Sequence, residues 1–297
     1  MTEFKEKKIN MKVKNKSSHR KIRMPIIFNV IIIIIITLFG VLPFLWLIVN
    51  SFKSAEELYK LPIVWLPSKL AFKNYVGAII SFPLVRYLLN SVLVSGTAAI
   101  ISSFISLCAA YGMNKSKFKA NNYLLIALLF TQLLPGVVIL IPFYFLLLKF
   151  HLTDKIIGLI LAYIIFFIPF GTLTLKSYLE SAYPKELEES AEIDGCNEYQ
   201  TFYKITLPLC TPGLAAIGIF AFIGSWNEFM FASILITNEK FKTIQQGLYS
   251  FSGQHASFSN TGAAFAAGAI IVFPVLLATF YIQRYMVTGL SSGALKE

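Results

Sequence analysis

The acidic residues of the chain are concentrated in one short segment. Seven of its 15 Asp and Glu residues lie between Glu180 and Glu198. The small side chains among these carboxylates would let another surface approach closely. The alternative is a solvated, charged loop that caps a helix bundle. The candidate site residues in and directly after this segment are Glu189, Ser190, Ala191, Gly195, Ile205, Leu207 and Pro208.

The same segment has the pattern of a short helix, a turn and a second helix. Pro184 suits the first helical turn, where its missing N–H is not needed. Small and apolar residues then recur at helical spacing on one stripe. Gly195 ends this helix, because glycine accepts the left-handed conformation of a helix C-terminus. The stripe consists of Leu187, Ser190, Ala191 and Asp194, and the second turn carries Tyr199, Phe202 and Ile205.

Signals of catalysis are missing from the sequence. It contains no Gly-Lys dipeptide and therefore no P-loop for ATP. Three cysteines without a CxxC pattern suggest reduced, structural thiols, and three widely separated histidines suggest no metal site. We therefore expect no catalytic residue, no metal and no cofactor bound by this chain.

Glu228 is the only acidic residue well inside a long apolar stretch. Its charge costs at least about 2.5 kcal/mol at the middle of a bilayer unless it meets protein or water. Counted from Pro212 it lies about 24 Å along a helix, close to one membrane surface. Two interpretations stay open, a side chain that reaches the outer headgroups and one that faces a pore. Trp226 and Asn227, its neighbours, join it as candidates for a substrate pathway.

A second candidate for the pathway is Gln132, which precedes Pro135, Gly136 and Pro142 in another apolar stretch. This spacing predicts a broken helix, which membranes tolerate where the backbone packs on protein or lines a cavity. Kinked packing and pore lining are both compatible with it.

The elements that must position these residues are membrane helices. Hydrophobic residues make up 56% of the 297 residues, charged residues only 14%, and the mean hydropathy is +0.68. Globular domains contain roughly 25% charged residues. The sequence therefore predicts an all-α integral membrane protein. Six stretches have the length of about 20 residues that a crossing requires, namely 25–49, 88–112, 123–148, 156–178, 211–236 and 263–286.

Lys and Arg residues set the expected orientation. Nine of the 26 lie in the first 23 positions, and with the N-terminus in the cytoplasm 17 fall on the inner side. Both termini are then cytoplasmic. The basic tail 1–24 suits anionic lipid headgroups, and no motif supports nucleic-acid binding. The remaining parts are an outer loop at 50–87, which we expect to lack helices, a core at 88–286 with the cytoplasmic segment 181–208, and a tail at 287–297.

Two stretches predict close helix packing. Ser91, Ser95, Ser102 and Ser106 form two small-xxx-small pairs, and Gly262, Ala266, Ala267 and Gly268 cluster in the last stretch.

The acidic segment resembles the cytoplasmic signature of binding-protein-dependent ABC importer permeases, E-A-A-x3-G-x9-I-x-L-P. Six of the seven fixed positions match with every spacing kept, and Ser190 replaces one alanine. Two further stretches are similar to the carbohydrate branch of this family, especially to the six-span subunit of maltose-type permease pairs. They are Ser225–Phe229 and Gln283–Lys296.

This resemblance implies a mechanism and partners. Such permeases work in the bacterial cytoplasmic membrane as one half of a heterodimeric pore, with two ATPase subunits that bind ATP and magnesium and an extracytoplasmic sugar-binding protein. The signature residues would couple the pore to an ATPase, with Glu189 offering charge, Ala191 permitting contact and Gly195 making the turn. Gly195→Asp should then abolish docking of the ATPase. The polar segment 237–262, with Gly247 and Gly253, would face the binding protein.

The expected substrate is a carbohydrate, of oligosaccharide size. An importer of glycerol phosphate or polyols is the nearest alternative, but phosphate would want a cationic pocket, and Arg86 is the only arginine near a membrane-facing outer end. An ion-coupled carrier would need more intramembrane acids or inverted repeats. A membrane-embedded enzyme would need a catalytic cluster.

Overall fold

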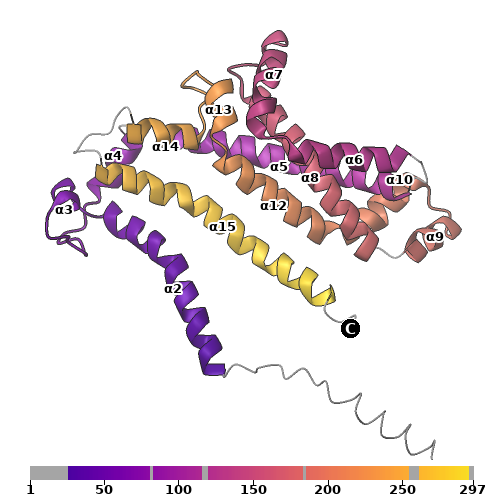
Figure 1. Cartoon of the computed structure of the whole chain (residues 1–297), viewed down its shortest axis with the longest axis horizontal. Coiled ribbons are helices and arrows are strands. Elements are labelled where there is room, and N and C mark those ends of the chain that lie inside the picture. The colour runs from indigo at the N-terminus through magenta and orange to yellow at the C-terminus, as the bar shows by residue number, and fades with distance from the viewer. Residues whose placement is uncertain (1–25, 81–82, 116–119, 183–184, 254–260, 294–297) are drawn as a thin grey trace, which may run out of the picture. The chain divides into compact units, whose positions relative to one another are not determined.

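The chain is entirely helical in the part that its computed structural model describes, residues 26–80, 83–115, 120–182, 185–253 and 261–293. It divides into two compact units, Met1–Trp46 and Leu47–Glu297. The helices are α2 Ile26–Ser51, α3 Ala55–Tyr59, α4 Lys73–Ile80, α5 Leu84–Lys115, α6 Ala120–Leu133, α7 Gly136–Lys149, α8 Ile156–Ala182, α9 Lys185–Ile193, α10 Glu198–Thr201, the π-helix η1 Phe202–Thr206, α11 Leu207–Leu209, α12 Thr211–Asn227, α13 Met230–Leu235, α14 Ile244–Gly253 and α15 Thr261–Gly293 (Figure 1). The predicted all-α class is confirmed.

Four helices are long and apolar enough to cross a membrane. They are α2, α5, α8 and α15, which match the first, second, fourth and sixth predicted stretches. Two bent helix pairs raise the possible number of crossings to six.

The third predicted stretch, 123–148, is not one continuous helix. α6 ends at Leu133 and α7 begins at Gly136, and the two meet at 101°. Pro135 lies in the break and caps α7. Proline lacks the N–H of a helical hydrogen bond and disfavours a helical residue before it, so the break follows from the sequence.

The fifth predicted stretch, 211–236, is divided as well. α12 ends at Asn227, Glu228 is extended, and the short α13 follows. At its other end α12 forms an angle of 71° with the helical run Glu198–Leu209. Glu228 therefore lies at a corner of the chain instead of inside a regular helix.

Three predicted loops contain helix. Residues 50–87, expected to lack helices, hold α3 and α4, and Ser54 and Glu57 form a capping box that starts α3. The polar segment 237–262 contains α14, and α15 continues through the predicted tail to Gly293. These helices were not predicted because they are short and contain polar residues. Short helices depend on caps and on packing partners, not on a long apolar run.

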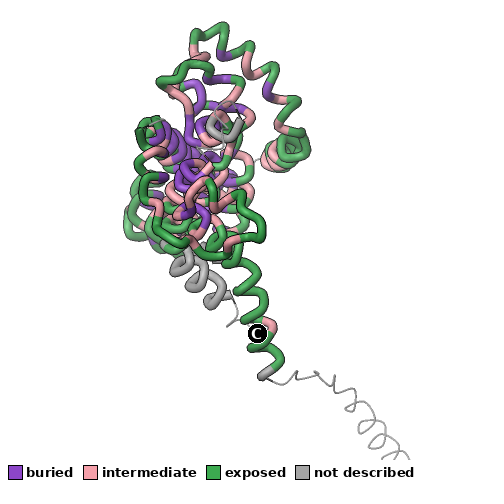
Figure 2. Tube along the Cα trace, turned by 90° about the vertical axis from the view of Figure 1, so that its left-hand side faces the viewer, coloured by how far each residue is buried: buried purple, intermediate pink, exposed green. Residues whose placement is uncertain are grey.

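The core of the second unit forms around α5, which packs mainly against α8 and α12. Ser91, Ser95, Ser102 and Ser106 are all at most 2% exposed, which confirms their predicted packing role. The Ser106 hydroxyl donates to the Ile168 carbonyl of α8 at 3.2 Å. In α15, Ala266 and Ala267 are equally buried, as predicted. Buried residues gather where the helices of this unit meet (Figure 2).

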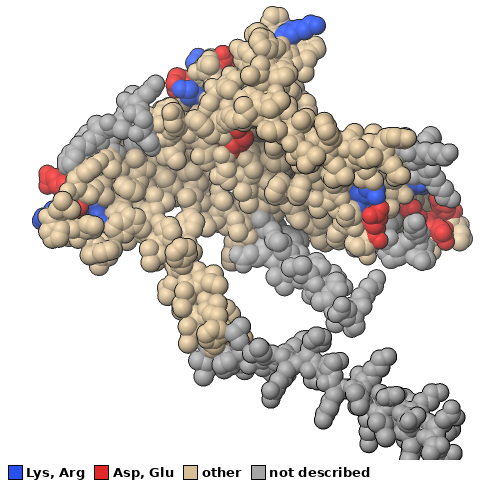
Figure 3. All heavy atoms as spheres, viewed as in Figure 1, with Lys and Arg blue, Asp and Glu red and all other residues tan. Residues whose placement is uncertain are grey.

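Charged side chains of the described residues lie mostly at the periphery of the second unit. On the face shown in Figure 3, the region between is broadly uncharged. An uncharged middle with charged ends is the distribution that a bilayer requires.

Candidate functional site

The first helix of the acidic segment ends in a Schellman motif centred on Gly195. The Cys196 amide donates to the Ala191 carbonyl at 2.9 Å, and the Gly195 amide donates to the Glu192 carbonyl at 3.1 Å. Gly195 has φ +81°, a conformation that glycine adopts without strain. The turn predicted at this residue is therefore present.

The second half of the segment is anchored in the core. Asn197 and Gln200 form a capping box that starts α10, and the π-helix η1 follows directly. Phe202 is 7% exposed and packs with the partly buried Ile205 in an apolar cluster with α5 and α8. Tyr199, expected on the same stripe as Phe202, is 79% exposed instead. Leu207 joins this cluster and Pro208 is exposed.

The exposed face of α9 differs from the expected one. Ala191 is 3% exposed, so its small side chain permits packing within the chain, whereas Glu189 and Ser190 face outward. Ile193, at 85% exposed, is the most accessible apolar side chain of the helix. The surface available to a partner is therefore acidic with two apolar side chains, Ile193 and the less exposed Leu187, and Ala191 lies behind it.

Lys115 connects this segment to α5. Its ammonium lies 3.5 Å from a Glu192 oxygen and 3.2 Å from a Glu198 oxygen. One cation thus holds α9 and α10 together at the cytoplasmic end that the sequence predicts for α5. Sequence reasoning counted Lys115 only as a topology signal, because a pairing over this separation leaves no local pattern.

Glu228 is held by hydrogen bonds within the protein. Its carboxylate accepts hydrogen bonds from the Phe231 amide at 2.8 Å, the Ala232 amide at 3.1 Å and the Tyr163 hydroxyl at 2.7 Å. Tyr163 is 2% exposed. The carboxylate therefore caps α13 and ties it to α8, which satisfies the charge inside the protein.

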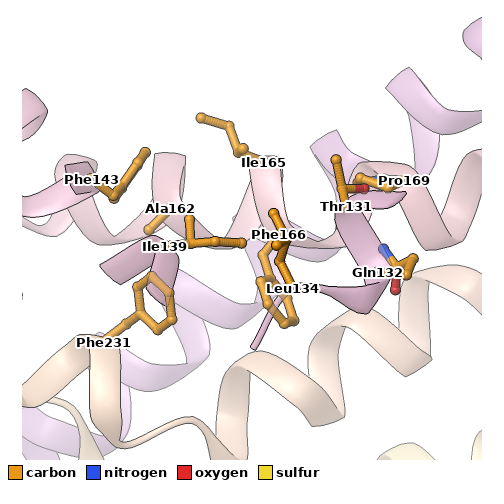
Figure 4. Close-up of a pocket in the computed structure, with 10 residues that line it drawn as sticks. All are labelled: Thr131, Gln132, Leu134, Ile139, Phe143, Ala162, Ile165, Phe166, Pro169 and Phe231. Atoms are coloured by element: carbon orange, nitrogen blue, oxygen red, sulfur yellow. The ribbon is translucent and has the colours of Figure 1, made fainter. Parts of the chain in front are cut away.

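The four predicted pathway residues do not form one site. Trp226 is 1% exposed and stacks on Phe222 in an apolar cluster. Asn227 is exposed and donates to the Ile223 carbonyl. Gln132 lines a separate, mainly apolar cavity of about 240 Å³ beside α8, where it lies with Thr131 at one end (Figure 4).

The segment 237–246 is fixed by hydrogen bonds from two sides. Asp154, in the turn before α8, accepts from the Asn238 amide at 2.9 Å and from the Thr237 hydroxyl at 2.9 Å. From α5, the Tyr87 hydroxyl donates to Glu239, and the Ser91 hydroxyl accepts from the Ile244 amide at 2.8 Å. None of these partners was singled out from the sequence for this contact.

The two glycines expected to face a binding protein lie in α14. Gly247 is buried within the helix and Gly253 is its last residue. The part of the predicted loop at 254–260 lies outside the described residues. Among those described, no three His, Cys, Asp or Glu residues gather as metal ligands. All three cysteines are free thiols, and only Cys210 is buried.

The sequence of the chain matches one known protein family. The family described as "binding-protein-dependent transport system inner membrane component" matches residues 102–292. The chain belongs to this family. The match begins in α5 and includes the whole acidic segment. The chain is accordingly a multi-pass membrane permease, and the resemblance inferred from its signature is confirmed.

Curated relatives cover most of the permease. The probable ABC transporter permease protein YurM of Bacillus subtilis is 34% identical over 86% of this chain and 83% of the relative. The diacetylchitobiose uptake permease DasC of Streptomyces coelicolor is 31% identical over 86% and 92%. The trehalose/maltose permease MalG of Thermococcus litoralis is 32% identical over 92% and 97%.

A solved structure shares the fold of the permease. A chain of a bacterial ABC transporter that imports the acidic polysaccharide alginate aligns with a TM-score of 0.73, covering 87% of this chain and 95% of that one. Its sequence identity of 20% supports the fold alone.

Proposed function

We propose that this permease is one subunit of an ATP-driven ABC importer that carries a carbohydrate of oligosaccharide size across a bacterial cytoplasmic membrane. Its partners would be a second permease, two ATPase subunits that hold ATP and magnesium, and an extracytoplasmic sugar-binding protein. The named sugar uptake systems among its relatives support the substrate class. Importers of glycerol phosphate or polyols, and ion-coupled carriers, are not favoured by these relatives.

The observation that carries the coupling role is the placement of α9. The helix ends at the left-handed Gly195, its Ala191 is buried, and its Glu192 is paired with Lys115 of α5. An exposed acidic helix that contacts a membrane helix can transmit a movement of a bound basic partner to the membrane helices. Residues 181–208 are the proposed coupling segment, with Glu189 as its charged contact.

Hydrogen bonds between distant segments support six crossings. Asp154 contacts Asn238, so the segments before α8 and after α13 belong on one side of the membrane. The chain between them contains α8 and the bent run Glu198–Asn227, and an even number of crossings is met if both cross. Tyr87 contacts Glu239, which supports the start of α5 on that side too. A crossing by the bent pair of α6 and α7 is consistent with these contacts.

The ends of the chain follow the same logic. The Tyr59 hydroxyl lies 2.8 Å from the Thr261 hydroxyl, so α3 and the start of α15 share one side. If α2 and α15 each cross once, the proposed arrangement has both termini on the opposite side of the membrane, the side proposed for the coupling segment. This agrees with the orientation expected from Lys and Arg.

The experiment that tests the proposal is a tagged purification from native membranes in mild detergent, with partners identified by mass spectrometry. Recovery of an ATPase, a second permease and a binding protein would support it. Recovery of this chain alone, or only with itself, would contradict it.

A pair of variants isolates the coupling segment. Gly195→Asp should abolish recovery of the ATPase while the chain still inserts, because it adds a negative charge at a helix C-terminus that is already acidic. Gly195→Asn is the matched control, since Asn has nearly the same shape, no charge and a tolerance for positive φ. Space is not limiting, because a Cβ at Gly195 meets no atom within 4 Å. Undiminished ATPase recovery with Gly195→Asp would sink the coupling role.

A further inference from the structure

Residues of α13, α14 and the segments beside them line an unassigned cleft. These two helices lie at the end of α12 that is away from the coupling segment (Figure 1). The volume of the cleft is about 300 Å³, at the lower end of the range of about 300–1,000 Å³ for small-molecule sites. That size suits one or two sugar rings. The lining residues are Phe229, Ser233, Ile236, Thr237, Lys242, Gln246, Tyr249 and Ser250.

Two aromatic side chains form one wall of this cleft. The rings of Phe229 and Tyr249 have centroids 5.0 Å apart and planes tilted by 46°. Tyr249 is 67% exposed and Phe229 37%, so both rings offer surface to a ligand. The C–H face of a pyranose is apolar and packs against such rings. Large exposed aromatics held together beside hydroxyl groups are typical of binding sites.

Two serines of the lining offer oxygen lone pairs. The Ser233 hydroxyl donates to the Phe229 carbonyl at 2.7 Å, and the Ser250 hydroxyl donates to the Gln246 carbonyl at 3.0 Å. Because their protons are engaged within the protein, the two oxygens face a ligand as acceptors. Sugar hydroxyls are the donors that such acceptors require.

The cleft is rigid before any ligand arrives. Gln246 is 5% exposed, its amide donates to the Ile236 carbonyl at 2.8 Å, and it accepts from the Thr243 amide at 3.0 Å. Thr237 is held by Asp154. A site whose walls are already fixed loses little entropy when it binds a small ligand.

The charges around the cleft are compensated. The Lys242 ammonium is paired with Glu239, and the Asp154 carboxylate is bound by donors of the adjoining segment. A carboxylated sugar would therefore meet no unpaired cation in this lining and would lose its hydration without compensation.

We infer that the α13–α14 cleft is a subsite for a neutral sugar, stacked on Tyr249 and Phe229 and hydrogen-bonded to Ser233 and Ser250. This deepens the proposed function and depends on it for the substrate class.

The test uses the full chain in lipid nanodiscs with three probes, maltose, diacetylchitobiose and an alginate disaccharide, measured by saturation-transfer NMR titration. A neutral probe should bind and the alginate disaccharide should not. Tyr249→Leu should weaken binding of the neutral probe about tenfold, because the stacked ring is lost. Tyr249→Phe keeps the ring and should stay within about twofold of the unmodified chain.

Tyr123→Ala is the matched control, because Tyr123 on α6 is 76% exposed and lies outside the cleft. It should bind like the unmodified chain. The inference is overturned if neither neutral probe binds, if the alginate disaccharide binds as well as they do, or if Tyr249→Leu binds normally. Recovery of the ATPase with Tyr249→Leu is measured in parallel. If Tyr249→Leu still recovers the ATPase but no longer binds the sugar, the subsite is supported. If even the unmodified chain recovers no ATPase, the proposed function is contradicted, independently of the subsite.

Discussion

The carboxylate of Glu228 stabilises the corner between α12 and the short α13. It accepts two backbone amides at the start of α13 and the hydroxyl of the buried Tyr163. Glu228→Gln keeps the shape but replaces one acceptor oxygen by a donor, so one of these donors loses its partner. We expect the free energy of unfolding to fall by about 2 kcal/mol, measured by dodecyl sulfate titration in mixed micelles.

Tyr163→Phe provides the comparison for this corner. It removes a single donor and leaves both backbone amides on the carboxylate, so its expected loss is smaller, about 1 kcal/mol. Because the two residues touch, the losses in the double variant should not add. Unchanged stability of Glu228→Gln would contradict the structural role of the carboxylate. Normal sugar uptake by the same variant would contradict a role of Glu228 in the substrate pathway.

Asp154 makes the outer segment sensitive to acid. Burial raises the pKa of its carboxyl, but hydrogen bonds from Asn238 and Thr237 outweigh this and lower the pKa below its ordinary value. The stabilisation is therefore present above pH about 3.9 and is lost as the pH falls through the lowered pKa. Asp154→Asn should unfold about 1 kcal/mol more easily at pH 7.

The pH profile provides the check on Asp154. In melting curves between pH 7 and pH 3, the difference between the unmodified chain and Asp154→Asn should shrink only at the acidic end. A difference that stays constant over this range would mean that the Asp154 charge does not hold the segment.

Residue-level prediction succeeded where the cause was local. The turn at Gly195 follows from the left-handed preference of glycine. Lys115 and Asp154 were missed because their partners lie 77 or more residues away, beyond any periodic pattern. Trp226 was expected near a pathway, but an aromatic residue in an apolar stretch looks the same whether it is buried or lines a pore.

At the scale of elements, glycines set how closely the central helices approach. A Cβ at Gly171 of α8 would lie 2.5 Å from the Ser106 hydroxyl oxygen and 2.9 Å from the Ser106 Cβ of α5. Gly171→Ala should therefore push α5 and α8 apart and lower the free energy of unfolding by about 1–3 kcal/mol, measured by the same titration.

Gly96 and Gly112 supply matched controls for this prediction. Both lie in α5, and a Cβ at either position meets no atom within 4 Å. Alanine there should be neutral or should stabilise the chain by up to about 1 kcal/mol, because it favours helix. If Gly171→Ala behaves like these controls, the contact with Ser106 is not a tight one.

Long apolar helices were predictable, whereas their breaks and the short helices were less so. Hydropathy located α2, α5, α8 and α15, since crossing a bilayer demands an unbroken apolar run. Pro135 indicated the break after α6. The corner at Glu228 and the helix α14 depend on contacts with α5 and α8, which the local sequence does not contain.

At the scale of the whole molecule, the number of crossings decides on which side of the membrane each connecting segment lies. Four and six crossings place the contacting segments differently. If the bent pairs were re-entrant, the turn at Asp154 and the segment at Asn238 would lie on opposite sides of the membrane. Their hydrogen bond of 2.9 Å therefore supports the proposed six crossings. In that arrangement both segments would lie outside and the coupling segment inside.

Single cysteines test this arrangement in cells. In a chain whose three native cysteines are replaced by alanine, Lys155→Cys and Lys240→Cys should react with a membrane-impermeant maleimide in intact cells, because both positions are exposed in the segments that Asp154 joins. Tyr199→Cys, in the coupling segment, should react only after the membrane is made permeable. Labelling of Tyr199→Cys in intact cells would mean that the run Glu198–Asn227 does not cross, and the ATPase could not then reach the segment proposed to receive it.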